Sequence, residues 1–374
     1  MPALPLSTTP DGAGPYRVLV VDDSAVIRTI LAAWLRVDKA IAVAGFATDG
    51  DMAVEAAKKL QPEVVLLDIE MPGMNGLDAL PGILKAAPGA RVIMCSTLTH
   101  AGAEITMRAL HAGAADYVAK PQSSELGSAD HFRRDLIEKV KALAESARRE
   151  AKRPLPFSVP ADQDGKASAA GGHTLRRPGT AAVRLLLIGC STGGPQALIR
   201  LFSEWRKPLR VPILITQHMP PTFTALLARR LDAEGTIPCR EAVEGAPLQP
   251  GLAYLATGDR HLTVVAGPAG PCVKLDDGPQ ENFCRPAVDP MFRSAATLYG
   301  AGCLAAVLTG MGHDGLAGAR YIVEAGGTVL TQDRATSIVW GMPGAVTEAG
   351  LSARVLPLAE MAHALQQSIN GDLT

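Results

Sequence analysis

Short apolar runs alternate with amphipathic stretches along the first 138 residues of the chain. The spacing of the apolar positions predicts β-strands with helices between them. Strands are predicted at residues 17–21, 41–46, 64–67, 91–95 and 117–119, and helices at 24–35, 49–60, 76–86 and 103–112. Asp49-Gly50 before one helix and Ala112-Gly113 after another are typical start and stop signals. Five βα units of this length predict a doubly wound, flavodoxin-like, five-stranded parallel sheet.

A second α/β pattern begins near residue 184. Apolar runs predict its strands at 184–188, 211–216, 303–309 and 327–331. Further runs separated by Gly and Asp are typical of an antiparallel excursion, at 251–256, 261–266 and 272–275. The second domain is therefore expected to be a mainly parallel α/β sheet with an antiparallel hairpin.

Composition changes between the two patterns. Prolines and paired glycines within residues 139–182 are typical of a flexible linker. We therefore expect four segments, which are a disordered tail at 1–15, a first domain at 16–138, the linker at 139–182 and a second domain at 183–370.

Charge, cysteine spacing and hydropathy exclude several functional classes. Lys and Arg (36) nearly balance Asp and Glu (37), so no electrostatic footprint for nucleic acid is present. The six cysteines form no C-x-x-C pair, and reduced thiols are expected. The sequence starts without a secretory signal and contains no apolar run near the length of about 18 residues that a membrane span needs. A cytoplasmic protein without membrane insertion is expected.

Polar side chains follow four of the predicted strands of the first domain. Asp22 and Asp23 follow the first strand, Asp68 the third, Ser96 the fourth and Lys120 the fifth. Because the carboxyl ends of parallel strands meet at one edge, these side chains should share a pocket that suits Mg²⁺. A carboxylate beside Mg²⁺ and a lysine can accept and hold a phosphoryl group. The plain alternative is that the aspartates only cap helices, but the complete set favours a phospho-acceptor site.

These residues resemble the receiver domain of two-component response regulators. The shared motifs are the Asp22-Asp23 pair, D-I-E-M-P-G-M-N-G at 68–76, Ser96, Tyr117 and Lys120-Pro121. The resemblance implies that Asp68 accepts phosphate from a histidine kinase. It also implies that Asp23, Asp68 and the backbone carbonyl of Glu70 hold Mg²⁺, with Asp22 close by. The residues implied to respond to phosphorylation are Ser96, Tyr117 and Lys120.

In the second domain, Ser191 is the central residue of a G-x-S-x-G motif that ends an apolar strand. Such a serine lies on a sharp strand-to-helix turn that exposes its hydroxyl, and the first amides of the helix can stabilise negative charge. The glycine run lacks the Lys-Ser/Thr ending of a P-loop and the acidic residue of a dinucleotide site, so nucleotide binding is disfavoured. Cys190 is an alternative nucleophile, but it is expected to pack inward.

A base and an orienting carboxylate are predicted at the same sheet edge as Ser191. His218 follows the next strand, and Asp314 lies in a glycine-bracketed loop after a later one. His261 and His313 are the rival bases. The order Ser…His…Asp differs from the order in α/β-hydrolases and disfavours that superfamily. These residues predict a serine hydrolase.

The second domain closely resembles the chemotaxis protein-glutamate methylesterase (CheB) family over residues 184–366. Further shared motifs are R-P-A-V-D at 285–289, F-R-S-A-A at 292–296 and V-W-G-M-P at 339–343. The resemblance implies that Ser191 is the nucleophile, His218 the general base and Asp314 the orienting acid. It implies an oxyanion hole formed by the backbone amides of Thr192 and Met311. Cys284 and His313 depart from the family pattern and are expected to tune the substrate groove without touching the triad.

The order of receiver, linker and esterase implies a reaction and its control. The implied substrate is a γ-glutamyl methyl ester on a methyl-accepting chemotaxis receptor, with possible deamidation of receptor glutamines. The hydrolysis itself is expected to need no metal, and phosphorylation of Asp68 is expected to activate it. Two other functional classes are disfavoured. A transcription factor is disfavoured because no basic recognition helix is present, and an interaction adaptor with a dead hydrolase fold is disfavoured by the intact triad.

Overall fold

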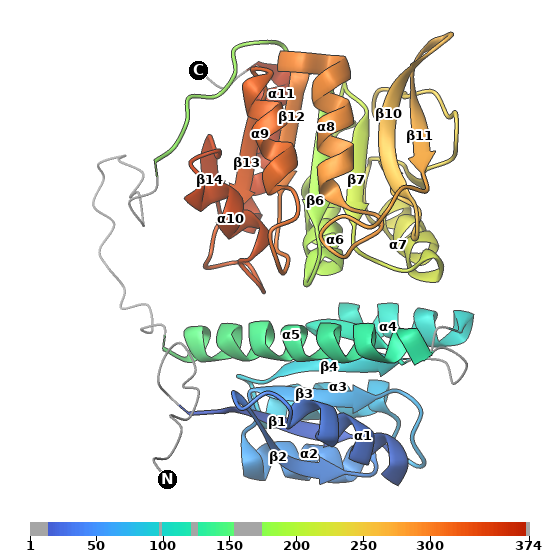
Figure 1. Ribbon diagram of the computed structural model, residues 1–374, viewed down its shortest axis with the longest axis vertical. Helices are drawn as coiled ribbons and strands as arrows, with labels where there is room; N and C mark the ends of the chain where they lie inside the picture. The colour runs from blue at the N-terminus through green and yellow to red at the C-terminus, as the bar shows by residue number, and fades with distance from the viewer. Residues whose placement is uncertain (1–13, 97–98, 121–125, 153–173, 372–374) are drawn as a thin grey trace. The chain divides into compact units, whose positions relative to one another are not determined.

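The computed structural model describes residues 14–96, 99–120, 126–152 and 174–371. The chain forms two α/β units, each built on its own parallel sheet (Figure 1). Residues 1–13 of the expected tail, residues 153–173 of the expected linker and Pro121 lie outside the described residues.

The N-terminal unit contains a five-stranded sheet in the order β2-β1-β3-β4-β5, with every pair parallel. Its strands are β1 (Tyr16–Val21), β2 (Ile41–Ala47), β3 (Val64–Asp68), β4 (Arg91–Ser96) and β5 (Asp116–Ala119). The connecting helices are α1 (Ala25–Leu35), α2 (Gly50–Leu60), α3 (Gly76–Ala86) and α4 (His100–His111), and α5 (Leu126–Ala151) follows β5. This is the doubly wound sheet that the apolar pattern predicted.

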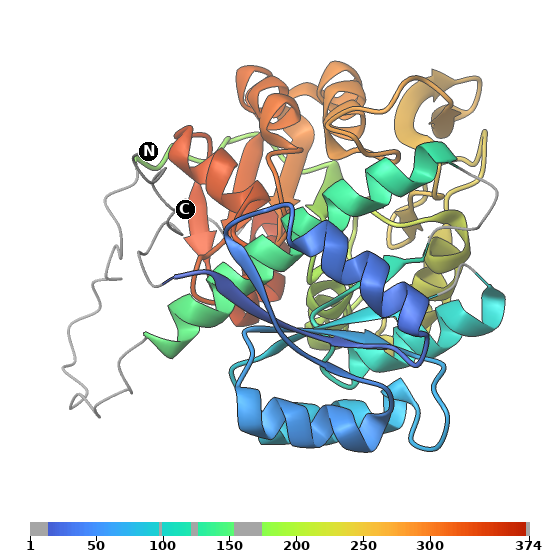
Figure 2. The same cartoon turned by 60° about the horizontal axis from the view of Figure 1, so that its bottom comes forward.

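Helix ends in this unit follow from local side-chain chemistry. The Asp49 carboxylate accepts a hydrogen bond from Met52 N at 2.8 Å, and Asn75 Oδ1 accepts one from Asp78 N at 2.9 Å, so both residues cap helices. Helices α1 and α5 contact each other and cover one face of the sheet (Figure 2). Helix α5 continues to Ala151, beyond the expected end of the first domain at residue 138.

The C-terminal unit contains a seven-stranded sheet in the order β14-β13-β12-β6-β7-β9-β8, again with every pair parallel. Its strands are β6 (Leu185–Cys190), β7 (Ile213–Gln217), β8 (Cys239–Glu241), β9 (Ala253–Leu255), β12 (Cys303–Val307), β13 (Thr328–Gln332) and β14 (Arg354–Leu356). The strand order reverses between β6 and β12. In an open parallel sheet such a reversal opens a crevice at the carboxyl edge, where ligands bind.

A separate hairpin is formed by β10 (His261–Gly267) and β11 (Gly270–Asp276), which pair antiparallel as predicted. The prediction for residues 251–256 was wrong. This segment contains β9, which lies in the main sheet and pairs parallel to β7 and β8. A three-residue strand is too short for apolar spacing to reveal its partner, because only long-range pairing decides between hairpin and sheet.

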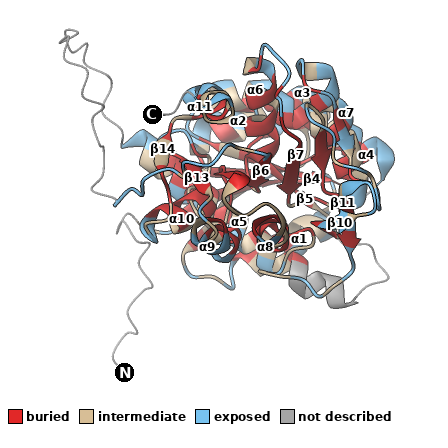
Figure 3. Cartoon of the chain, turned by 90° about the horizontal axis from the view of Figure 1, so that it is seen from above, coloured by how far each residue is buried: buried red, intermediate tan, exposed pale blue. Residues whose placement is uncertain are grey.

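Helices cover both faces of the seven-stranded sheet. They are α6 (Gly194–Glu204), α7 (Pro221–Glu234), α8 (Val288–Tyr299), α9 (Leu316–Glu324), α10 (Met342–Glu348) and α11 (Leu358–Asn370), with a short 3₁₀ turn at Gly300–Gly302. The strands between them are buried along almost their whole length (Figure 3). Continuous burial on both faces explains why these strands are apolar runs rather than alternating patterns. Within the described residues, no helix is long and apolar enough to cross a membrane.

Candidate functional site

The N-terminal unit gathers three carboxylates at the carboxyl edge of its sheet. The ligand atoms of Asp22, Asp23 and Asp68 all lie within 4.8 Å of one another. Asp22 and Asp68 are buried, whereas Asp23 is exposed. Lys120 Nζ forms ion pairs with Asp22 Oδ2 at 2.8 Å and with Asp68 Oδ1 at 2.7 Å. The strand-end residues predicted to share a pocket are therefore brought together.

Burial and ion pairing have opposite effects on the pKa values of Asp68 and Lys120. Burial raises the pKa of Asp68, and the hydrogen bond from Lys120 only partly offsets it. Burial would lower the pKa of Lys120, but its bonds to Asp22 and Asp68 raise it. The lysine therefore stays charged and offsets part of the negative charge of the carboxylates. Crowded oxygen donors beside a single ammonium fit a hard divalent cation such as Mg²⁺.

The backbone around Asp68 is tightly packed. A Cβ atom on Gly76 would lie 1.9 Å from the carbonyl oxygen of Asp68, so only glycine fits there. Ser96 is buried at the end of β4, Tyr117 is buried as the second residue of β5, and Lys120 N donates to Ser96 O at 2.7 Å. Glu70 is exposed and lies in the loop after β3, two residues after Asp68. The predicted residues of this site thus lie at one sheet edge, except Tyr117, which lies within β5.

In the C-terminal unit, Ser191 lies directly after β6, on the turn into α6. Gly193 has a φ of +76° and Gly194 begins the helix. A Cβ on Gly194 would lie 1.9 Å from Gln217 Oε1, so any other residue there would displace the Gln217 amide. Gln217, the last residue of β7, donates through Nε2 to Ser191 O at 3.0 Å and to His218 O at 3.2 Å. One buried amide therefore joins the main chains of the predicted nucleophile and base.

The loop after β12 closes over the serine turn. A Cβ on Gly310 would lie 3.0 Å from Ser191 Cβ and 2.3 Å from Met342 Sδ, so the close approach again depends on glycine. Met311 follows Gly310 directly. Within the described part of the chain, its N–H donates to no protein acceptor. That amide is available to a ligand.

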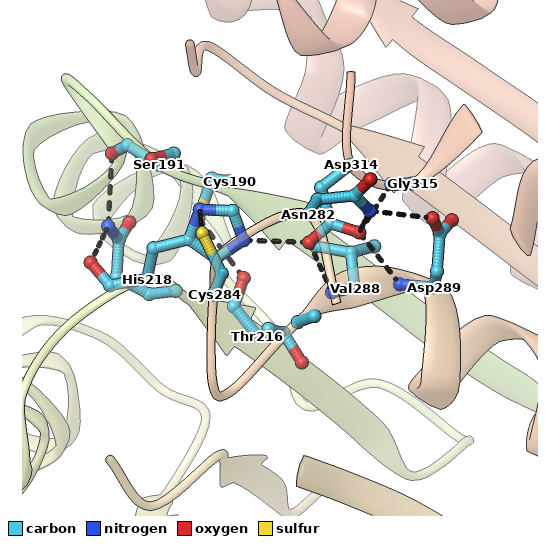
Figure 4. Close-up of polar contacts among 12 residues, drawn as sticks. Cys190, Ser191, Thr216, His218, Asn282, Cys284, Val288, Asp289, Asp314 and Gly315 are labelled. Carbon is cyan, nitrogen blue, oxygen red and sulfur yellow. Dashed lines mark hydrogen bonds and ion pairs between the residues drawn. The ribbon is translucent and has the colours of Figure 1, made fainter. Parts of the chain in front are cut away.

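His218 and Asp314 form a close pair across the crevice between β6 and β12. His218 Nε2 lies 2.7 Å from Asp314 Oδ2, and Asp314 is buried (Figure 4). Because a carboxylate can only accept, Nε2 carries the proton and Nδ1 is the nitrogen left to act as a base. The predicted base and acid are thus in contact.

Asp314 is held by backbone donors as well as by the imidazole. The N–H groups of Val288 and Asp289, in the first turn of α8, donate to it at 2.6 and 3.1 Å. Burial would raise the pKa of Asp314, but the hydrogen bond from His218 and these amides lower it. The positive end of the α8 dipole adds to this effect. The carboxylate therefore remains ionised although it is buried.

A second buried carboxylate, Asp289, lies beside Asp314. Asn282 Nδ2 donates to Asp289 Oδ2 and to Asp314 Oδ1, both at 3.0 Å. Burial, and then the charge of Asp314, raise the pKa of Asp289. The side-chain amide of Asn282 thus links the two carboxylates.

Cys284 contacts the predicted triad, which corrects the expectation that it would not. Its Sγ lies 3.3 Å from His218 Nδ1, on the opposite side of the ring from Asp314 (Figure 4). Burial alone would lower the pKa of His218, but the charge of a Cys284 thiolate and the bonds to Asp314 and Cys284 raise it to about 10. The expectation failed because Cys284 and His218 are 66 residues apart, and apolar spacing says nothing about such a contact.

The rival residues weighed from the sequence have other roles. His261 is buried, and both ring nitrogens are engaged, by Ala287 N at 3.1 Å and by Pro279 O at 3.0 Å. His313 is exposed. Cys190 is fully buried, as expected, and its burial raises the pKa of its thiol. The geometry therefore favours His218 over both other histidines.

Sequence reasoning missed three residues that support the site: Gln217, Asn282 and Asp289. A signal existed for Gln217, because a glutamine that ends an otherwise apolar buried strand needs a partner. Asp289 is the last residue of the R-P-A-V-D motif at 285–289, to which the family resemblance assigned no role. Asn282 had no signal, since its two acceptors come from other segments.

These features define the class of the molecule: a receiver-type unit with clustered carboxylates, joined to a parallel α/β unit with a hydrolase-type site. The family described as CheB methylesterase matches residues 186–365, and the family described as response regulator receiver domain matches residues 18–129. A protein-glutamate methylesterase/protein-glutamine glutaminase of Maricaulis maris is 44% identical over 95% of this chain and 96% of its own length. The protein-glutamate methylesterase/protein-glutamine glutaminase 2 of Caulobacter vibrioides is 48% identical over 92% of this chain and 96% of its own length. The chain belongs to the CheB family.

Solved structures of the separate domains are also similar. The catalytic domain of Thermotoga maritima CheB methylesterase is 39% identical, with a TM-score of 0.49, and the match covers 50% of this chain and 99% of that one. The response regulator domain of Thermotoga maritima CheB is 45% identical, with a TM-score of 0.33, and the match covers 35% of this chain and 97% of that one.

The bridging amide of Gln217 yields a first prediction. Gln217→Glu replaces the donor by a carboxylate that faces two carbonyl oxygens, so the serine turn and His218 lose their shared tie. We expect ester hydrolysis to fall by about tenfold or more and the melting temperature to drop by several degrees. Gln249→Glu, at an exposed glutamine, is the control and should change neither. Unchanged hydrolysis in Gln217→Glu would contradict this role.

Asn282 yields a second prediction. Its φ is +52°, so Asn282→Gly removes the amide without backbone strain, whereas Asn282→Asp keeps the shape but adds a third carboxylate. We expect the free energy of unfolding at neutral pH to fall by about 2 kcal/mol in Asn282→Gly and by more in Asn282→Asp. Urea denaturation measures both values. If both variants had the same free energy of unfolding as the wild-type chain, the bridge between the carboxylates would be unimportant.

Proposed function

We propose that this chain hydrolyses γ-glutamyl methyl esters on methyl-accepting chemotaxis receptors and releases methanol. The observation that carries the proposal is the His218–Asp314 pair, with Nε2 2.7 Å from Oδ2, beside Ser191 at the reversal point of the sheet. The relatives named protein-glutamate methylesterase/protein-glutamine glutaminase support the same chemistry. Deamidation of receptor glutamines uses the same acyl transfer, with ammonia as the leaving group.

The proposed reaction begins at Ser191. Its Oγ attacks the ester carbonyl carbon while His218 Nδ1 takes the hydroxyl proton. The backbone N–H groups of Thr192 and Met311 donate to the oxyanion that forms. His218 then gives the proton to the leaving methoxide, and methanol departs. Water activated by the same nitrogen hydrolyses the acyl-serine and restores the free enzyme.

Asp314 supports the base through both steps. Its ionised carboxylate fixes the proton on Nε2 and stabilises the imidazolium that forms when Nδ1 accepts a proton. Because Asp314 is buried and held by the amides of α8, its charge is little screened by water. The ester hydrolysis is proposed to need no metal.

The receiver unit is proposed to control this reaction. Asp68 accepts a phosphoryl group from a histidine kinase, and Lys120 is placed to pair with the new phosphoryl oxygens. Asp23, Asp68 and the Glu70 carbonyl would hold Mg²⁺, with Asp22 adjacent. That cation, when bound, neutralises charge on the transferring phosphoryl oxygens. Ser96 and Tyr117 are proposed to rearrange in response.

The proposed switch needs only a modest free energy. A tenfold rise in activity corresponds to a difference of about 1.4 kcal/mol between the two receiver states. We also propose domain limits at 16–138 and 183–370, with a linker at 139–182, and a cytoplasmic location in which kinase and receptor tails are accessible.

The triad assignment is tested on a methylated receptor. Ser191→Ala should abolish methanol release because no acyl-enzyme can form, and Asp314→Asn should lower it by about 10⁴-fold because the imidazole loses its orienting charge. Ser203→Ala, at an exposed serine of α6, is the control and should retain full activity. Methanol release by Ser191→Ala would refute the assignment of the nucleophile.

The phosphorylation site is tested with acetyl phosphate and Mg²⁺. The wild-type chain should release methanol faster when both are present, and Asp68→Asn should lose this stimulation but keep basal hydrolysis. Asp51→Asn, at an exposed aspartate in the first turn of α2, should be stimulated like the wild type. Stimulation of Asp68→Asn would place the phospho-acceptor elsewhere.

A further inference from the structure

The nitrogen that must take the proton from Ser191 is already occupied. His218 Nε2 is bound to Asp314, and His218 Nδ1 lies 3.3 Å from Cys284 Sγ. Within the described residues, Ser191 Oγ makes no hydrogen bond. The structure therefore shows a base whose free nitrogen faces a thiol instead of the serine hydroxyl.

Cys284 ends a short turn at residues 281–284 that is held by several hydrogen bonds and an ion pair. Glu281 and Cys284 exchange backbone hydrogen bonds at 3.1 and 2.9 Å, and the two residues between them have positive φ angles. Glu281 forms a two-point ion pair with Arg293 of α8, at 2.8 and 2.5 Å. Asn282 binds Asp314 at 3.0 Å. The turn is thus bound to Arg293 of α8 and to Asp314, and these contacts position Cys284 next to His218.

The position of Cys284 differs from that of the other cysteines. Cys95, Cys190, Cys239 and Cys303 are buried, and burial raises the pKa of each thiol. Cys272 is partly exposed on the hairpin strand β11. Among the described residues, Cys284 is the cysteine that contacts an imidazole, so Cys272 offers a matched control.

We propose that Cys284 is a positioning residue that holds His218 Nδ1 in the resting enzyme and competes with Ser191 for that nitrogen. The proposal rests on the proposed function of His218 as the base. Cys284 makes no bond to substrate. It acts through the imidazole, and it must give way before the serine hydroxyl can be deprotonated.

The competition follows from proton balance. The thiol proton either remains on sulfur and points to Nδ1, or moves to Nδ1 and leaves a thiolate beside an imidazolium. Neither state adds or removes a proton from the pair, and in both states Nδ1 cannot accept the proton of Ser191. The titratable groups that face His218 in the described structure are Cys284 on one side and Asp314 on the other. Asp289 lies behind Asp314, joined through Asn282.

The direction of the pH effect follows. A thiolate favours the charged imidazole, so removing Cys284 lets the neutral base form at lower pH. Asp314 remains in each variant and keeps its own effect on the ring. A loss that came only from disturbed packing would lower kcat without moving the pH at which activity rises.

The first test compares Cys284→Ala and Cys284→Ser with Cys272→Ala, using methylated receptor as substrate. We expect the acid limb of the kcat–pH profile to move to lower pH by about one unit or more in both Cys284 variants, with KM changed less than about twofold. Cys272→Ala should follow the wild-type profile. An unshifted profile in both Cys284 variants would overturn the proposal, even if kcat fell.

A second test does not depend on ester hydrolysis. Iodoacetamide alkylation of the full chain at pH 7 is followed by mass spectrometry at Cys284 and Cys272. We expect His218→Gln to slow alkylation of Cys284 by about tenfold or more and to leave Cys272 unaffected, with folding verified by circular dichroism. Equal rates at Cys284 in both proteins would overturn the pairing. A different outcome would contradict only the proposed esterase function. In it, alkylation of Cys284 depends on His218 as expected, but the wild-type chain releases no methanol.

Discussion

The buried charge of Asp314 is the constraint on which the hydrolase site depends. An isolated carboxylate in such a place would take up a proton, because desolvation disfavours its charged form. Here the carboxylate accepts hydrogen bonds from His218, from Asn282 and from the first amides of α8. Each donor belongs to a different segment. The need to satisfy one charge therefore fixes the loop after β12, the turn before α8 and the imidazole relative to one another.

The sheet topology makes this convergence possible. Strand order reverses between β6 and β12, so the loops that follow them leave the sheet edge in opposite directions and open a crevice. Ser191 ends one side of that crevice and Asp314 lies on the other. Gly194 leaves space for the side chain of Gln217, and Gly310 leaves space for those of Ser191 and Met342. The chemistry is thus set by strand order and by two small residues, and the helices supply amides and dipoles.

The sequence revealed the parts of this arrangement that local pattern encodes. Apolar runs identified both sheets. Strand-end positions predicted that the carboxylates around Asp68 lie together, as they do, because the carboxyl ends of parallel strands share an edge. The same argument predicts Ser191 and His218 as candidates for the hydrolase site. Strand β9 was placed wrongly, since three residues carry too little pattern to choose between hairpin and sheet. The contact of Cys284 with His218 was also missed. It depends on a turn with positive φ at two non-glycine residues, which no spacing rule indicates.

The two sites share a feature that neither shows alone. In the receiver unit, Lys120 occupies the oxygens of Asp22 and Asp68, and in the hydrolase unit Cys284 occupies Nδ1 of His218. The Asp68 carboxylate and the His218 imidazole thus each have a partner from their own chain, which avoids a buried polar atom without a partner. In the mechanism proposed for the hydrolase unit, the serine hydroxyl must replace Cys284 at His218 Nδ1 before it can be deprotonated. The resting contacts of both units therefore have the same physical origin, which is the need to give buried polar groups a partner.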